Sequence, residues 1–107
     1  MKKEFRPLEE VFNFIQNMPN ESQVELVQII TKLEEDGRIV PPYGKKIADD
    51  LFEIRVRKGK QTRVFYYYAK NDIIYGVHAF YKKTQKTPLK EIKYAQKVIK
   101  QLKKQNL

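Results

Sequence analysis

The sequence predicts an α+β fold: an N-terminal helical hairpin, an antiparallel sheet of three to four strands, and a C-terminal helix. Two observations support this order. The spacing of apolar residues changes from the helical to the strand period at Leu51, and it becomes helical again after Thr87 and Pro88. A length of 107 residues suits one domain. We therefore expect residues 1–107 to form a single domain.

The first half of the chain predicts two helices joined by a tight turn. We expect the first helix to begin at Pro7, because a proline N–H is not needed in a first turn, and to end before Pro19. Asn20 is the expected N-cap of the second helix, and Gly37 its stop. Segment 38–50 holds two prolines and a glycine, so we expect it to be irregular. The predicted buried stripe of the second helix is Leu26, Val27, Ile29, Ile30 and Leu33.

Three strands are predicted at residues 51–57, 62–69 and 73–81, where apolar and polar side chains alternate or β-branched and aromatic residues are frequent. The short connections between them imply antiparallel neighbours. Residues 1–5 are a candidate fourth strand at the sheet edge. We expect Thr87 to cap the last helix, with the apolar stripe Leu89, Ile92, Ala95, Ile99 and Leu102.

The composition excludes several classes of protein. Without cysteine there is no disulfide framework, thiolate zinc site or cysteine nucleophile, and a single histidine argues against a His-rich metal site. No apolar run approaches the roughly 18 residues of a membrane span, and no apolar stretch follows the basic N-terminus as in a signal peptide. We expect a cytoplasmic protein with no cofactor, no metal and no membrane partner.

The whole chain has a net charge of +9, and its positive charge is concentrated toward the C-terminal end. Residues 1–50 carry 7 basic and 10 acidic side chains, residues 51–81 carry 6 and 2, and residues 82–107 carry 9 lysines and one acid. This uneven distribution is typical of a protein that binds a polyanion. A role of the lysines in solubility alone is the alternative.

Side-chain parity predicts that one face of the sheet combines cations with aromatic rings. Such a face suits phosphate contact and base stacking. A solvated face without function is the alternative, because antiparallel sheets often leave one face in water. The residues expected on this face are Arg55, Arg63, Tyr67, His78, Phe80 and Lys82.

Familiar catalytic patterns are absent from the sequence. Nothing in the spacing of Ser22, His78 and the aspartates suggests a triad, and there is no Walker loop or Gly-x-Gly-x-x-Gly. No carboxylate pair marks a metal-dependent nuclease. His78 alone is more often a packed strand residue than a catalyst.

Residues 80–88 read Phe-Tyr-Lys-Lys-Thr-Gln-Lys-Thr-Pro and precede a lysine-rich helix. Together with segments 44–47, 51–55 and 63–66, this motif resembles the RelE/HigB toxin superfamily, in its phage-derived branch, over roughly residues 8–103. The resemblance implies a curved antiparallel sheet and a toxin of a type II toxin–antitoxin pair, which cleaves mRNA on the ribosome without a metal. It also implies as partners a cognate helix-turn-helix antitoxin and, only through that antitoxin, operator DNA.

The same resemblance implies roles for particular residues. Arg55 and Arg63 look like the basic strand residues that hold the scissile phosphate, and Lys83 and Lys86 like catalytic lysines of the motif. Glu53 stands where several relatives carry a second basic residue. Some relatives use a C-terminal tyrosine as a general acid, and Tyr94 is only a loose counterpart. From the strand pattern rather than the resemblance, the expected RNA-binding residues are Arg57, Tyr67, His78, Phe80 and Lys82.

Two functions from different classes stay open. The first is an mRNA endonuclease in which an RNA 2′-hydroxyl attacks its neighbouring phosphate. The second is a non-catalytic member of the same fold, either an RNA-binding module or a gyrase-inhibiting toxin. The motif at residues 82–88 favours the nuclease, whereas Glu53 and the missing tyrosine favour the binder.

Overall fold

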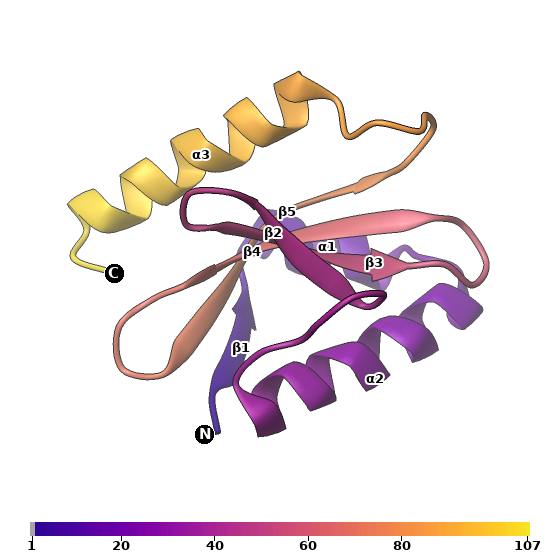
Figure 1. Cartoon of the computed structure of the whole chain (residues 1–107), viewed down its shortest axis with the longest axis horizontal. Helices are drawn as coiled ribbons and strands as arrows, with labels where there is room; N and C mark the ends of the chain where they lie inside the picture. Colours follow the sequence, from indigo (N-terminus) through magenta and orange to yellow (C-terminus); the bar gives the residue numbers. More distant parts are fainter. Residues whose placement is uncertain (1) are drawn as a thin grey trace.

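The computed structural model describes residues 2–107 and confirms the α+β class, with three helices and a five-stranded sheet (Figure 1). The strand order in the sheet is β1-β5-β4-β3-β2. The elements in chain order are β1 (Glu4–Pro7), α1 (Glu9–Gln16), α2 (Asn20–Asp36), β2 (Gly44–Ala48), β3 (Leu51–Val56), β4 (Thr62–Tyr68), β5 (Ile73–Tyr81) and α3 (Leu89–Lys104).

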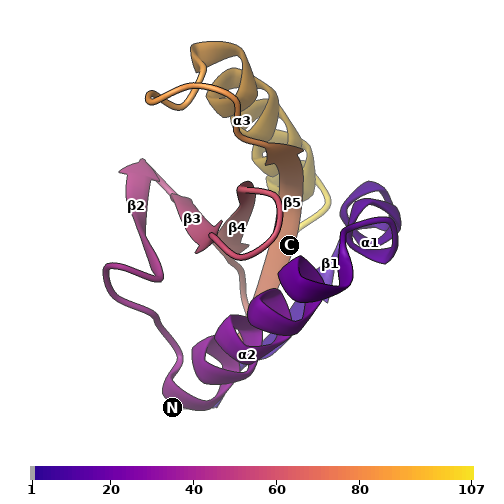
Figure 2. The ribbon, with the colours of Figure 1, turned by 90° about the vertical axis from the view of Figure 1, so that its right-hand side faces the viewer.

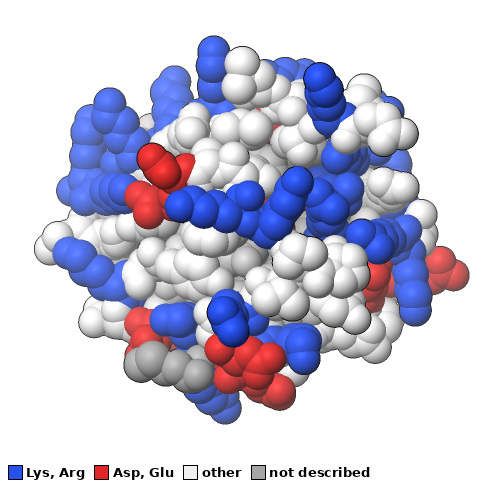
Figure 3. All heavy atoms as spheres, in the orientation of Figure 1, with Lys and Arg blue, Asp and Glu red and all other residues white. Residues whose placement is uncertain are grey.

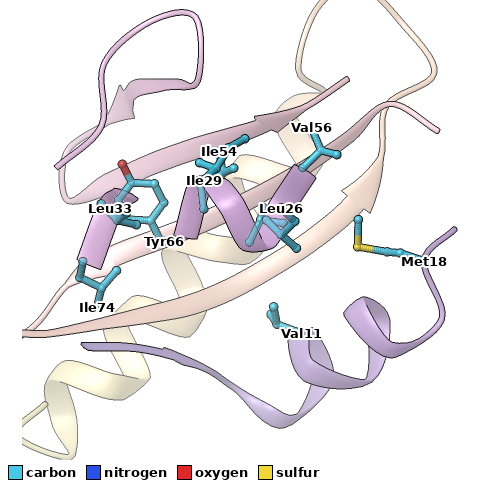
Figure 4. Close-up of a cluster of buried hydrophobic side chains, with 10 residues drawn as sticks. Val11, Met18, Leu26, Ile29, Leu33, Ile54, Val56, Tyr66 and Ile74 are labelled. Carbon is cyan, nitrogen blue, oxygen red and sulfur yellow. The ribbon is translucent and has the colours of Figure 1, made fainter. Parts of the chain in front are cut away.

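The sheet separates two helical layers. Helices α1 and α2 lie on one face and α3 lies on the other (Figure 2). Alternation along the central strands therefore buries both faces, since successive strand residues point to opposite sides. The core beneath α1 and α2 (Figure 4) contains Val11, Met18, Leu26, Ile29, Leu33, Ile54, Val56, Val64, Tyr66 and Ile74. The core beneath α3 contains Leu51, Phe65, Tyr67, Tyr75, Val77, Phe80, Ala95, Ile99 and Leu102.

The two predicted N-terminal helices are present, but they pack mainly on the sheet rather than on each other: α1 on β5 and β1, and α2 on β3 and β1. The predicted start at Pro7 is wrong, because Pro7 ends β1. Asn20 is the first residue of α2 and makes no capping hydrogen bond, so the predicted N-cap is also wrong. Gly37 ends α2 as predicted, in the left-handed region at φ 77°.

The predicted edge strand exists at residues 4–7, but it runs parallel to β5, so the sheet is mixed rather than antiparallel. Phe5 lies opposite Ile74, and Pro7 lies opposite Gly76. A Cβ at Gly76 would stand 2.8 Å from the Phe5 ring, so the close approach of β1 requires a glycine there. The helices between β1 and β5 supply the long connection that parallel pairing needs.

A second difference lies in the segment predicted to be irregular. Residues 44–48 form β2, which pairs antiparallel with β3 and brings the strand count to five. Lys45 lies opposite Glu53 in this pair. The strand is short, follows two prolines and carries adjacent lysines, so local propensity does not mark it. Its formation depends on the tertiary template of β3.

The strand parity predicted for β5 is wrong over half its length. Phe65 lies opposite His78 and Tyr66 lies opposite Gly76, so one extra β5 residue, Val77, is accommodated in a bulge. The bulge places Tyr75 on the same face as His78, which simple alternation assigns to opposite faces.

Helix α3 begins one residue later than predicted. Pro88 occupies the N-cap position and Leu89 is the first helical residue, and no side-chain cap from Thr87 is formed. Leu89 is exposed, whereas the other four residues of the predicted stripe face the sheet. The lysines of this helix lie on its exposed side, as the sequence predicts.

Adjacent residues of α2 provide a test of this packing. Leu26 is fully buried, whereas Val27, which the sequence places in the buried stripe, is 56% exposed. We expect Leu26→Ala to lower the free energy of unfolding by about 2–5 kcal/mol through loss of apolar contact and cavity formation. The matched control Val27→Ala should change it by no more than about 0.5 kcal/mol. Urea unfolding measures both, and equal losses would contradict the position of α2.

Candidate active site

Helix α3 covers much of the sheet face that the sequence predicts to be exposed. Tyr67 and Phe80 are buried in the α3 core, and the Tyr67 hydroxyl donates to the Leu107 carbonyl oxygen at 3.2 Å. His78 is partly buried, with Nε2 2.9 Å from Glu91 Oε1 on α3. The predicted exposure of these three rings is therefore wrong, because the apolar stripe of α3 needs an apolar surface to pack on. Their role in RNA binding remains an untested prediction.

The cationic end of the same face stays open. Arg55 and Arg63 lie directly opposite each other on β3 and β4, and Lys82 follows the end of β5. On the side of the molecule seen in Figure 3, Lys and Arg far outnumber Asp and Glu. An open hollow of roughly 660 Å³ lies at this end, lined by Gly59, Lys60, Gln61, Arg63, Lys82, Lys83, Thr84 and Gln85.

A buried carboxylate lies beside these cations. The side chain of Glu53 is 1% exposed, and its Oε2 accepts a hydrogen bond from Arg55 Nε at 2.8 Å. Its Oε1 lies 3.7 Å from Arg63 Nε, within ion-pair range but beyond hydrogen-bond distance. A buried charge is tolerated when it is paired. Glu53 is therefore the counter-ion of both arginines.

Arg63 is the more deeply placed of the two arginines, with 7% of the residue exposed. Burial lowers the pKa of its guanidinium, the Glu53 carboxylate opposes that change, and Arg55 and Arg57 add to it. An arginine stays protonated in proteins throughout the physiological range, so the site keeps this positive charge. Its Nη1 donates to the Thr62 carbonyl oxygen at 3.1 Å, which fixes the plane of the guanidinium.

Lys82 lies near the same charges. Burial lowers the pKa of its ammonium, and the neighbouring Arg63 lowers it further. Glu53 acts in the opposite direction, and Arg55 and Lys45 make smaller contributions that lower it. Such a lysine gives up its proton more readily than an isolated one.

Helix α2 holds the turn that forms one wall of the hollow. The buried Ser22 hydroxyl donates to the Lys58 carbonyl oxygen at 2.7 Å and accepts from the Lys60 backbone N–H at 3.2 Å. Gly59, in the left-handed region at φ 69°, leaves room for this hydroxyl, since a Cβ there would stand 2.7 Å from it. Glu25 accepts the backbone N–H of Lys58 at 2.8 Å.

The remaining predicted residues differ in how close they lie to the hollow. Lys83 lines it, whereas Lys86 lies on the same loop but outside the lining. Arg57 is exposed at the end of β3, next to the turn. Tyr94 contacts His78 and donates its hydroxyl to Glu10 Oε2 on α1 at 2.8 Å. This hydrogen bond raises the pKa of Tyr94, which makes the hydroxyl a poorer acid.

Two further properties concern the part of the chain that the structure describes. Within residues 2–107, no three His, Asp or Glu side chains come together in a group that could hold a metal ion. Over the same range, no helix has both the length and the apolar character required to cross a membrane.

Comparison with known proteins shows that the fold is of the RelE type. The structure is similar to that of a double arginine-to-alanine variant of the E. coli toxin RelE in the free state, with a TM-score of 0.69 and 14% identity, covering 91% of this chain and 97% of that one. Residues 13–100 match the family described as phage-derived protein Gp49-like (DUF891), and the chain belongs to that family. These two findings confirm the resemblance to the RelE/HigB superfamily. A comparison with curated proteins found no match.

Sequence reasoning missed two residues that organise the site. Glu53 stands out in the sequence only as an acid where relatives carry a basic residue, although an acid two residues before Arg55 and diagonal to Arg63 is well placed to bridge them. Ser22 was considered only as a nucleophile, whereas it holds the turn at residues 58–60. No sequence signal links Ser22 to a turn so far along the chain.

The environment of Lys82 can be tested directly. We expect its ammonium to titrate at lower pH in the folded protein than in the urea-unfolded chain, because burial and Arg63 both disfavour its charge. Arg63→Gln should raise the folded midpoint without fully restoring it, since burial is the larger cause. NMR titration of the Lys82 Cε signal measures both changes. Equal midpoints in the folded and unfolded protein would contradict this environment.

Proposed function

We propose that this protein is the toxin of a type II toxin–antitoxin pair and that it cleaves mRNA on the ribosome. One observation carries the proposal: in a RelE-like fold, Arg63 and Lys82 line one open hollow, and Arg55 lies directly opposite Arg63 on the neighbouring strand. A phosphodiester fits such a site, because guanidinium groups bind phosphate oxygens in pairs. The expected place of action is the cytoplasm.

The reaction we propose is attack of an RNA 2′-hydroxyl on the adjacent phosphorus. The 2′-oxygen forms a bond to phosphorus, the bond to the 5′-oxygen of the next nucleotide breaks, and a 2′,3′-cyclic phosphate remains. The proton leaves the 2′-hydroxyl, and another is delivered to the departing 5′-oxygen. Arg55 and Arg63 stabilise the charge that builds on the phosphate oxygens, which needs no metal ion.

Lysines of the motif complete this assignment. The resemblance implies Lys83 and Lys86 as catalytic lysines, but we assign proton transfer to Lys82, because it lines the hollow beside Arg63 and its pKa is lowered by burial and by Arg63. Lys83 lies in the lining of the hollow and Lys86 on the loop beyond it, which suits contact with flanking phosphates. Arg57 is assigned to the same track of RNA backbone. The rings of Tyr67, His78 and Phe80 support the sheet from beneath α3.

The test compares two loss-of-charge variants. Expression of the wild-type protein should stop growth and cut mRNA in a translating extract, and Arg63→Ala should remove both effects. Loss of one electrostatic donor typically lowers the rate by about 10²–10³. Arg63→Lys should recover only part of the activity, since an ammonium cannot make a two-pronged contact.

The control for net charge is Lys97→Ala, on the exposed side of α3. It removes the same charge away from the hollow and should leave cleavage nearly unchanged. Equal losses in both variants would mean that charge acts only as a diffuse attraction for RNA, and the site assignment would fail. RNA binding with no cleavage by the wild-type protein would instead support the non-catalytic alternative.

The proposed partner is an antitoxin of the helix-turn-helix class. We expect the antitoxin, and not this chain, to contact operator DNA. With a net charge of +9, this protein should bind a partner surface that is acidic. We therefore expect the association rate of the pair to fall steeply between low and physiological salt, as measured by stopped-flow fluorescence. A rate independent of salt would show that charge does not guide this recognition.

A further inference from the structure

An acidic residue in a phosphate site needs an explanation, because its charge repels the ligand. Glu53 is the most deeply buried charged side chain in this region, at 1% exposure, and it lies among Lys45, Arg55 and Arg63. The same carboxylate lowers the attraction of the site for RNA. The position of Glu53 is explained if it orients the two arginines. It is not explained if it binds the ligand.

Both contacts of Glu53 involve the same atom type on its partners. The Nε atoms of Arg55 and Arg63 lie 2.8 Å and 3.7 Å from the two carboxylate oxygens. Nε is the guanidinium nitrogen nearest the backbone, so the outer Nη groups are left free for a ligand. Among residues 2–107, neither Nη of Arg55 has a protein acceptor, and Arg63 uses only Nη1, on the Thr62 carbonyl oxygen.

The sheet register makes this carboxylate necessary. Arg55 and Arg63 are directly opposed cross-strand partners, and like charges in that position repel. Glu53 precedes Arg55 by two residues on the same face and lies diagonal to Arg63. One carboxylate therefore offsets the repulsion of a pair that the backbone forces together.

The two contacts differ in strength. The Arg55 contact is a charge-assisted hydrogen bond, whereas Glu53 Oε1 and Arg63 Nε are both buried and have no hydrogen-bond partner in the described chain. Arg63 is thus held by charge and by its Thr62 contact rather than by a bond to the carboxylate. It can shift toward a phosphate without breaking a hydrogen bond to Glu53.

We propose that Glu53 is a positioning residue, which holds Arg55 and Arg63 side by side so that their outer nitrogens face a phosphate group. The effect on cleavage rests on the proposed function, whereas the effect on arginine geometry does not. Removal of the carboxylate should therefore impair turnover without weakening RNA binding, because the site becomes more positive as its geometry loosens.

The first measurement needs no activity. In ¹H–¹⁵N NMR spectra, the Arg55 Nε–H should exchange slowly with water in the wild-type protein, because it donates to a buried acceptor. In Glu53→Gln, we expect this signal to broaden or to exchange at least tenfold faster. The matched control is Glu34→Gln, an identical change at a part-buried carboxylate that accepts the Phe5 backbone N–H. It should leave the Arg55 signal unchanged.

The second measurement separates binding from turnover. On programmed ribosomes, kcat of Glu53→Gln should fall about 10- to 100-fold, since small misplacement of reacting groups is costly. The Kd for an mRNA with a 2′-deoxy group at the scissile position should stay equal or tighten. If Glu53→Gln does not fold, Glu53→Asp keeps the charge with a shorter reach, and kcat should fall with Kd unchanged.

Unchanged Arg55 exchange in folded Glu53→Gln, or an unchanged kcat, would overturn the positioning role. A fall in RNA affinity as large as the fall in kcat/KM would also overturn it, because Glu53 would then act through binding alone. A wild-type protein that cleaves no mRNA on ribosomes contradicts the proposed function instead. In that case the exchange of the Arg55 Nε–H decides the positioning role by itself.

Discussion

The pairing of β3 with β4 places Arg55 and Arg63 directly opposite each other, and the site depends on how the repulsion between their charges is offset. Two guanidinium groups opposite each other repel, and burial of Arg63 adds a desolvation cost. The carboxylate of Glu53 offsets both effects from within the same sheet face. Replacement of this acid by a basic residue would remove that compensation and add a third positive charge to the pair.

The rest of the fold leaves an open hollow beside this cluster and covers the aromatic part of the same sheet face. Helix α3 packs on the aromatic part of the face, and the loop that precedes it carries Lys82 and Lys83 to the rim of the hollow. On the opposite side of the sheet, α2 fixes the turn at residues 58–60 through Ser22 and Glu25. The hollow is thus bounded by two segments that separate helical layers hold in place.

Much of the fold follows from periodicity, because long amphipathic segments constrain their own structure. The range of β5, the end of α2 at Gly37 and most of the buried stripe of α3 were predicted correctly. The faces of β4 were also correct, which placed Arg63 on the same side as Arg55. These features depend on local alternation that a single strand or helix displays by itself.

The errors arise where distant parts of the chain decide the outcome. Strand β2 forms only against β3, and β1 pairs with a strand that comes much later in the chain. The bulge at Val77 changes the facing of β5 without a local signal. The exposure of Phe80 was misjudged because its cover, α3, is separated from it by a loop of no regular structure. Burial of Glu53 likewise depends on other strands, since Lys45 on β2 and Phe65 on β4 lie opposite it.

The order of synthesis gives the cover of the aromatic face a particular consequence. All five strands are complete at Tyr81, yet the cover that α3 places over Phe65, Tyr67, Tyr75 and Phe80 comes from residues 92–102. A chain in which α3 has not yet docked on the sheet therefore has an uncovered hydrophobic surface, which is the type of species that chaperones bind and that aggregates when crowded.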